Sequence, residues 1–287
     1  MKTIYLHIGF GKTGTSSVQE FFFGNREEFA NQDLQYPMTG LIPYAHHGLA
    51  LFQFTEMPEG VQNLYLDLLE EIRNSPCSKV LLSSEQFCFL KKAYVAKVGS
   101  LFSEFKVKII FYVRTQTKLI ESTFLEWQKA DLDYKGNIDN FYNVAKRGFD
   151  FSLRLQPWIE VFGSDSIVVR VYDKKAIGDD TCLDVMKVLG LGLNEKVSEA
   201  NLRSNISLLP EFSKILGLVD KSEIAKDQRK LIVNELLQLS KYFKQSSSCS
   251  LLSEELKRDI LNHYASSNEL LSQQFLSKND RKIFLGN

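Results

Sequence analysis

The most informative segment of the chain is HIGFGKTGTSSVQEFF, residues 7–22. A short run of β-branched, aromatic and other apolar residues at positions 3–8 leads into it and stops at Gly9. A helical pattern follows from about Gly14 through Phe23. The order is therefore strand, glycine-rich loop and helix, which is typical of the first unit of an α/β sheet.

The same order recurs further along the chain. Apolar runs at residues 79–83, 106–113 and 166–173 have the length of buried strands, and a helical stretch spans Cys182 to Leu189. Continuous apolar strands that alternate with helices predict a parallel sheet covered on both faces. We therefore expect an α/β fold with a central parallel sheet flanked by helices, a P-loop-like three-layer arrangement.

Two further segments complete the expected organisation. Residues 35–60 are rich in Pro, Gly and aromatic residues, which indicates a long excursion over the edge of the sheet. From about residue 207 onward the pattern is helical, without a strand run. We expect an α/β core at residues 1–206 and a helical C-terminal extension at residues 207–287, packed on the core.

Composition and charge exclude several classes of protein. The 287 residues include 35 Lys+Arg and 35 Asp+Glu, and this neutrality argues against a nucleic-acid polymer as partner. No stretch approaches the ~20 apolar residues of a membrane span, and the N-terminal apolar run is too short for a signal peptide. The expected location is cytoplasmic. The four cysteines are scattered, without CxxC or zinc spacing, so no metal site is expected.

The glycine-rich loop has the composition of an anion cradle. Backbone amides at a helix N-terminus point at a bound anion, Lys12 adds a compact positive charge, and three hydroxyls add donors. The candidate residues are Gly11, Lys12, Thr13, Gly14, Thr15 and Ser16. The Walker A pattern is absent as written, because Leu6 stands where that pattern requires glycine. A structural turn with a chance Gly-Lys-Thr is the alternative.

A second candidate anion site follows the run at 106–113. Arg114 is expected at the carboxyl end of this strand, where ligands of open α/β sheets bind, and Ser122 follows eight residues later on a helix. A planar guanidinium fork and a hydroxyl suit a terminal phosphate. The alternative is a structural Arg114 paired with a helix carboxylate such as Glu121.

Together these segments resemble the sulfotransferases that use 3′-phosphoadenosine 5′-phosphosulfate (PAPS), and more closely their bacterial and carbohydrate-directed branch. KTGTSS at 12–17 resembles their 5′-phosphosulfate loop, and the Arg114–Ser122 spacing resembles their 3′-phosphate site. VVRVYDKK at 168–175 is similar to their strand ending in Tyr-acid-x-Lys, which implies that Tyr172 contacts the adenine. Arg203 lies where some members return a basic loop to the 3′-phosphate, although the glycine-bearing motif of the small-phenol branch is absent.

The resemblance loosely covers residues 1 to about 205 and implies an activity. The enzyme would transfer a sulfuryl group from PAPS to a hydroxyl of a saccharide or glycoconjugate, leaving adenosine 3′,5′-bisphosphate (PAP), with no metal required. Two separated anion sites also suit a donor that carries phosphate at both ends of one adenosine.

The acceptor hydroxyl must lose a proton, so we expect a general base beside Lys12. Glu85 follows the 79–83 run and is expected at the same sheet edge, where partial burial would suit a base; the alternative is a salt-bridge or helix first-turn residue. His46 and His47 are the competing pair, because histidine needs no pKa shift to act as a base near neutrality. We expect all three to contact substrate, with Glu85 as the first choice for the base and a histidine of the pair, with His47 as the catalytic candidate, as the alternative. Hydrogen-bonded or solvated loop histidines are the alternative.

Two other functions stay open. A P-loop-type nucleotide kinase or NTPase would want a carboxylate for magnesium, a role that only Glu85 or Asp173 could fill. A noncatalytic nucleotide- or glycan-binding protein would bind the donor without turnover.

Overall fold

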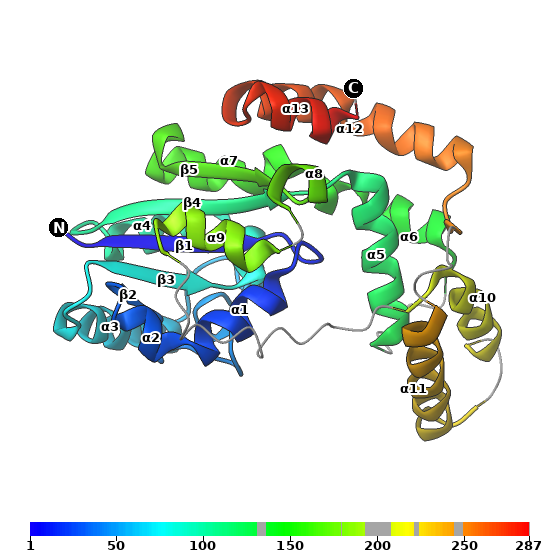
Figure 1. The fold of residues 1–287 in the computed structure, drawn as a ribbon, viewed down its shortest axis with the longest axis horizontal. Helices are drawn as coiled ribbons and strands as arrows, with labels where there is room; N and C mark the ends of the chain where they lie inside the picture. The colour runs from blue at the N-terminus through cyan, green and yellow to red at the C-terminus, as the bar shows by residue number, and fades with distance from the viewer. Residues whose placement is uncertain (131–135, 179, 193–207, 221–223, 244–248, 287) are drawn as a thin grey trace. The chain divides into compact units, whose positions relative to one another are not determined.

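The computed structural model describes residues 1–130, 136–178, 180–192, 208–220, 224–243 and 249–286. It contains a five-stranded sheet in the order β2-β3-β1-β4-β5 in which every pairing is parallel (Figure 1). The strands are β1 (Thr3–Gly9), β2 (Leu34–Gln35), β3 (Lys79–Ser83), β4 (Lys106–Val113) and β5 (Ile167–Val171). The predicted α/β class with a central parallel sheet is confirmed. The two-residue β2 was missed because it is too short to carry a pattern.

Helices connect the strands and make up the C-terminal region of the described chain. The α-helices are α1 (Thr15–Gly24), α2 (Arg26–Ala30), α3 (Glu59–Asn74), α4 (Lys92–Leu101), α5 (Gln116–Lys129), α6 (Ile138–Ala145), α7 (Phe151–Phe162), α8 (Lys174–Ile177), α9 (Thr181–Leu189), α10 (Pro210–Val219), α11 (Lys226–Phe243), α12 (Glu254–Phe275) and α13 (Lys278–Leu285). Short 3₁₀ helices lie at η1 (His47–Leu49), η2 (Glu85–Phe89), η3 (Lys146–Phe149) and η4 (Ser164–Ser166). In the described residues, no helix is long and apolar enough to span a bilayer.

Both faces of the sheet are buried, as the continuous apolar runs predict. Ile110 and Tyr112 of β4 join an apolar cluster that includes Val18 of α1 and Val185 of α9. Successive side chains of a strand point to opposite faces. Phe111, between them, accordingly packs against Phe151 of α7. Helices α1 and α9 therefore cover one face, and α7 contributes to the cover of the other.

The chain divides into two compact units. The first comprises residues 1–114, 151–203 and 268–287 and contains the sheet. The second comprises residues 115–150 and 204–267 and is helical where described. Its small apolar core consists of Leu125, Leu208, Leu216, Val233 and Leu236. The sequence predicted a single boundary between residues 206 and 207, whereas each compact unit combines segments from several parts of the chain. The predicted domain organisation stays a prediction.

The strand order gathers the polar segments at one edge of the sheet. Strand β1 is central, with β3 on one side and β4 on the other, so the chain leaves β1 at the point where the strand order reverses. Ligands of open α/β sheets bind at such a point, outside the carboxyl ends of the strands. We call this the carboxyl edge. The loop after Gly9, the Ser83–Glu85 segment and Arg114 all lie there.

Candidate functional site

The loop between β1 and α1 has the backbone of an anion-binding turn. Gly9 (φ 75°) and Gly14 (φ 80°) adopt left-handed conformations that glycine permits. Helix α1 begins at Thr15 without a side-chain cap, and the Val18 amide donates to the Gly14 carbonyl (3.1 Å). Amides at the start of a helix have no intrahelical acceptor. The predicted cradle therefore has the geometry of an open helix N-terminus.

Gly14 is also required by its surroundings. A Cβ at this position would lie 2.8 Å from Thr181 Oγ1 and 3.1 Å from Tyr172 Cε2. The loop is thus pressed against the start of α9 and the end of β5. Thr181 was missed by the sequence analysis, because only the folded sheet brings residue 181 next to residue 14.

The loop residues differ in what their side chains can offer. Thr13 is fully buried and its hydroxyl donates to the Phe10 carbonyl, so the prediction that this hydroxyl contacts a ligand is corrected: it closes the turn. Thr15 is also buried, whereas Gly11, Lys12 and Ser16 are half-buried. Thr13 can contribute its backbone amide, and Lys12 and Ser16 retain partly accessible side chains.

Arg114 joins the end of β4 to this loop. Its Nη1 donates to the Lys12 carbonyl (2.9 Å), and its guanidinium carbon lies 5.4 Å from the centroid of the Tyr172 ring. Lys12 has φ 65°, which is uncommon for a residue other than glycine. The bond from Arg114 therefore helps to hold a strained turn. Lys12, Arg114 and Tyr172, three residues predicted to contact the donor, lie together.

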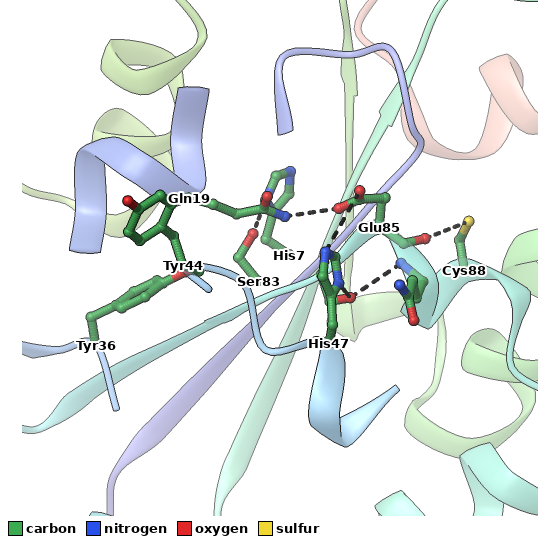
Figure 2. A network of polar contacts seen from close by, with 10 residues as sticks. His7, Gln19, Tyr36, Tyr44, His47, Ser83, Glu85 and Cys88 are labelled. Atoms are coloured by element: carbon green, nitrogen blue, oxygen red, sulfur yellow. Dashed lines mark hydrogen bonds and ion pairs between the residues drawn. The ribbon is translucent and has the colours of Figure 1, made fainter. Parts of the chain in front are cut away.

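Glu85 approaches the same loop from the β3 side. A Cβ added to Gly9 would lie 2.7 Å from Glu85 Cβ, so the two backbones are in close contact. Gln19 Nε2 of α1 donates to Glu85 Oε2 (2.9 Å), and His47 Nε2 lies 4.0 Å from Glu85 Oε1 (Figure 2). The side chains of Glu85 and His47 are 28% and 21% exposed, so both are partly open to solvent.

His47 is oriented by a buried serine. His47 Nδ1 lies 2.7 Å from Ser84 Oγ, and Ser84 Oγ also accepts the Gln86 amide (3.2 Å). Ser84 has no exposed surface, and its own amide donates to the His7 carbonyl (3.0 Å). Ser84 is therefore a support for His47 and not an accessible nucleophile. It was not singled out from sequence, because a serine at a strand end has many structural uses.

His46 points away from this network. It is fully buried; the Ser83 amide donates to its Nδ1 (3.1 Å), and its Nε2 lies 3.0 Å from the Pro37 carbonyl. Because the Ser83 amide can only donate, Nδ1 accepts and Nε2 carries the proton. Burial lowers the pKa of His46 to about 4. We expected His46 to contact substrate, but the structure gives it a structural role: its ring connects the 35–60 segment to Ser83 of β3.

Two predicted site residues, Ser122 and Arg203, lie outside the described part of the first compact unit. Ser122 is half-buried on α5, in the second compact unit. Arg203 lies outside the residues that the structure describes. Among the described residues, no cluster of three or more His, Cys, Asp or Glu side chains has the arrangement of a metal site.

Comparisons with known proteins add little about chemistry. No protein-family model matches the chain. The chain is similar to an uncharacterized protein from Archaeoglobus fulgidus, with 24% identity over 206 residues. The match covers 71% of this chain and 55% of that relative, so the chain spans about half the length of the curated protein it matches.

Proposed function

We propose that this protein is a PAPS-dependent sulfotransferase that acts on a hydroxyl of a saccharide or glycoconjugate. One observation supports the proposal: Arg114 donates a hydrogen bond to the Lys12 carbonyl, which joins the end of β4 to the β1–α1 loop, the two segments that we propose bind the anionic ends of the donor. A donor with phosphate at both ends of an adenosine needs two such segments within reach of each other. Glu85, a partly exposed carboxylate, lies at the same edge.

The loop would bind the 5′ end of the donor. Amides of residues 13–16 would hold the phosphosulfate, and Lys12 would stabilise the charge that develops on the bridging oxygen as the bond from sulfur to that oxygen breaks. Arg114 would bind the 3′-phosphate and so fix the position of the donor, with the Tyr172 ring against the adenine. The contact of Ser122 with the 3′-phosphate stays a prediction from the sequence. Arg203 keeps its proposed role at the 3′-phosphate.

Glu85 would accept the proton of the acceptor hydroxyl as the new bond from oxygen to sulfur forms. Gln19 donates to Glu85 Oε2, while Glu85 Oε1 lies 4.0 Å from His47 Nε2, so the imidazole adjoins the carboxylate that would take up the proton. His47 itself remains the alternative base. Sulfuryl transfer does not need a metal, because the transferred group carries less negative charge than a phosphoryl group.

Calorimetric titration with PAP in the absence of metal tests the proposal. We expect a Kd of ~1 µM or tighter, which corresponds to about 8 kcal/mol. Binding of magnesium ATP with indifference to PAP would instead favour the kinase or NTPase. Donor binding without turnover on any saccharide would favour the noncatalytic binding protein. No association with PAP would contradict the proposed donor.

A cytoplasmic location is part of the proposal. Cys77, Cys88 and Cys182 are buried free thiols. Unpaired thiols of this kind are compatible with a reducing compartment.

A further inference from the structure

Helix α1 serves two parts of the candidate site at once. Its N-terminus forms the anion cradle, and its fifth residue, Gln19, is only 5% exposed and donates to Glu85 Oε2 (2.9 Å). An anion held by the first turn of α1 and the carboxylate of Glu85 are therefore connected by a single rigid element. Figure 2 shows Gln19 reaching Glu85 from the side opposite to Cys88.

The other end of the loop also touches Glu85. Gly9, which precedes the cradle, would place an added Cβ 2.8 Å from Glu85 Cα. Glu85 is thus held at its backbone by the start of the loop and at its carboxylate by the helix that ends the loop. Its second oxygen, Oε1, faces His47 Nε2 at 4.0 Å. These contacts connect the loop to the Glu85 carboxylate and, through it, to the surroundings of the His47 ring.

We infer that Gln19 is a positioning residue that couples occupancy of the anion loop to the orientation of Glu85 and His47. The inference rests on the proposed function, because it assumes that this loop binds the donor and that Glu85 takes the acceptor proton. A neutral amide suits this role, since it restrains the carboxylate without supplying a charge that would neutralise a base. The donor would then arrange the base before the acceptor reacts.

The test uses the ring signals of the histidines, of which the chain has four. In protein labelled with ¹³C-histidine, the His47 signal is assigned as the one lost in His47→Asn. PAP and, separately, sodium sulfate are titrated into wild type, Gln19→Met and Gln19→Glu. Gln19→Met keeps the length of the side chain without its donor. Gln19→Glu keeps the shape but replaces the donor with a carboxylate beside Glu85, which repels it. Glu20→Gln, the next residue on α1, is the matched control.

We expect both probes to move the His47 signal in wild type and in Glu20→Gln. In Gln19→Met the probes should still bind, with Kd changed less than ~3-fold, while the His47 response is lost. In Gln19→Glu the His47 response should also be lost, and the added charge should weaken binding of both anions. With an acceptor in hand, Gln19→Met should lower kcat by ~10–100-fold with little change in the KM for PAPS, as expected for a displaced base. If Gln19 had only a structural role, its replacement would change both kcat and the KM for PAPS, or neither.

The outcomes separate the inference from the proposed function. If sulfate moves His47 through Gln19 but PAP does not bind, the inference stands and the PAPS donor is contradicted. If PAP binds and His47 does not respond, or responds equally in the Gln19 variants, the coupling is overturned while the donor survives. If neither probe binds, the loop is not an anion site and both are overturned.

Discussion

The two sides of the carboxyl edge carry different chemistry. On the β3 side, Ser84 supports His47, and His47 faces Glu85 in a network of hydrogen-bonding groups. On the β4–β5 side, Arg114 and the Tyr172 ring pack against each other. The loop at the end of β1 touches both, through Gly9 on the first side and through Lys12 on the second.

Under the proposed function, the glycine-rich loop would connect a side that accepts protons to a side that binds anions. A carboxylate and an imidazole can exchange a proton near neutrality, whereas a guanidinium stays charged and binds anions. Loss of a β3-side group should therefore affect turnover, and loss of a β4–β5-side group should affect affinity.

Glu85→Gln should have the largest effect. A positioned general base contributes typically 10²–10⁴-fold, so we expect kcat to fall by about 10³-fold, with the Kd for PAP changed less than ~3-fold. Turnover of PAPS with an acceptor found in a saccharide screen measures the first quantity, and calorimetry measures the second. His47→Gln is the comparison, and a greater loss of kcat in that variant would transfer the role of base from Glu85 to His47.

Arg114→Ala should weaken donor binding more than it slows transfer. A hydrogen bond to a charged group contributes about 1.5–3 kcal/mol, so the Kd for PAP should rise by ~10–100-fold. Arg114→Lys keeps the charge but loses the fork and should fall between Ala and wild type. Arg73→Ala, which removes an exposed pair with Glu104, is the control. An unchanged Kd for PAP in Arg114→Ala would show that the β4–β5 side does not bind the phosphate of the donor.

The sequence was sufficient to predict the sheet and the polar residues at its carboxyl edge. Apolar runs gave four of the five strands, because strands buried on both faces have a continuous signal. Gly9 and Gly14 indicated the loop, since both need a left-handed backbone. Arg114 and Glu85 were placed correctly at the edge, because each directly follows or closely follows a strand that ends there.

The contacts between segments could not be predicted in the same way. Gln19 contacts Glu85, and Thr181 contacts Gly14 of the loop, only after the sheet brings distant segments together, and neither residue was a candidate from the sequence. His46 and His47 are adjacent in sequence, yet one is fully buried and the other is partly open. The difference depends on which imidazole ring faces the backbone of β3. That orientation is a property of the fold and cannot be read from two adjacent histidines in the sequence.

The buried histidines should make stability depend on pH. Burial lowers the pKa of both His46 and His7 from 6.5 to about 4, so the unfolded chain binds protons at a pH where the folded protein does not. Their contribution is complete above pH 6.5 and is lost as the pH falls toward 4, by about 2 kcal/mol for each histidine at pH 5. Urea unfolding at pH 7.5 and pH 5 measures this loss. His46→Gln should be less sensitive to pH than wild type, and equal sensitivity would contradict the assignment.

Tyr172 should have the smallest effect, because its ring contributes by contact alone. A guanidinium over an aromatic ring at a partly exposed site is worth ~0.5–1 kcal/mol, so Tyr172→Leu should weaken PAP binding by ~2–5-fold. Tyr172→Phe keeps the ring and should bind as wild type does; if it is as weak as Leu, the hydroxyl and not the ring contacts the donor. A double-mutant cycle with Arg114→Ala locates the contact. If Tyr172→Leu no longer weakens PAP binding once Arg114 is replaced, the ring acts by holding the guanidinium. If Tyr172→Leu weakens PAP binding equally in both backgrounds, the ring contacts the nucleotide directly.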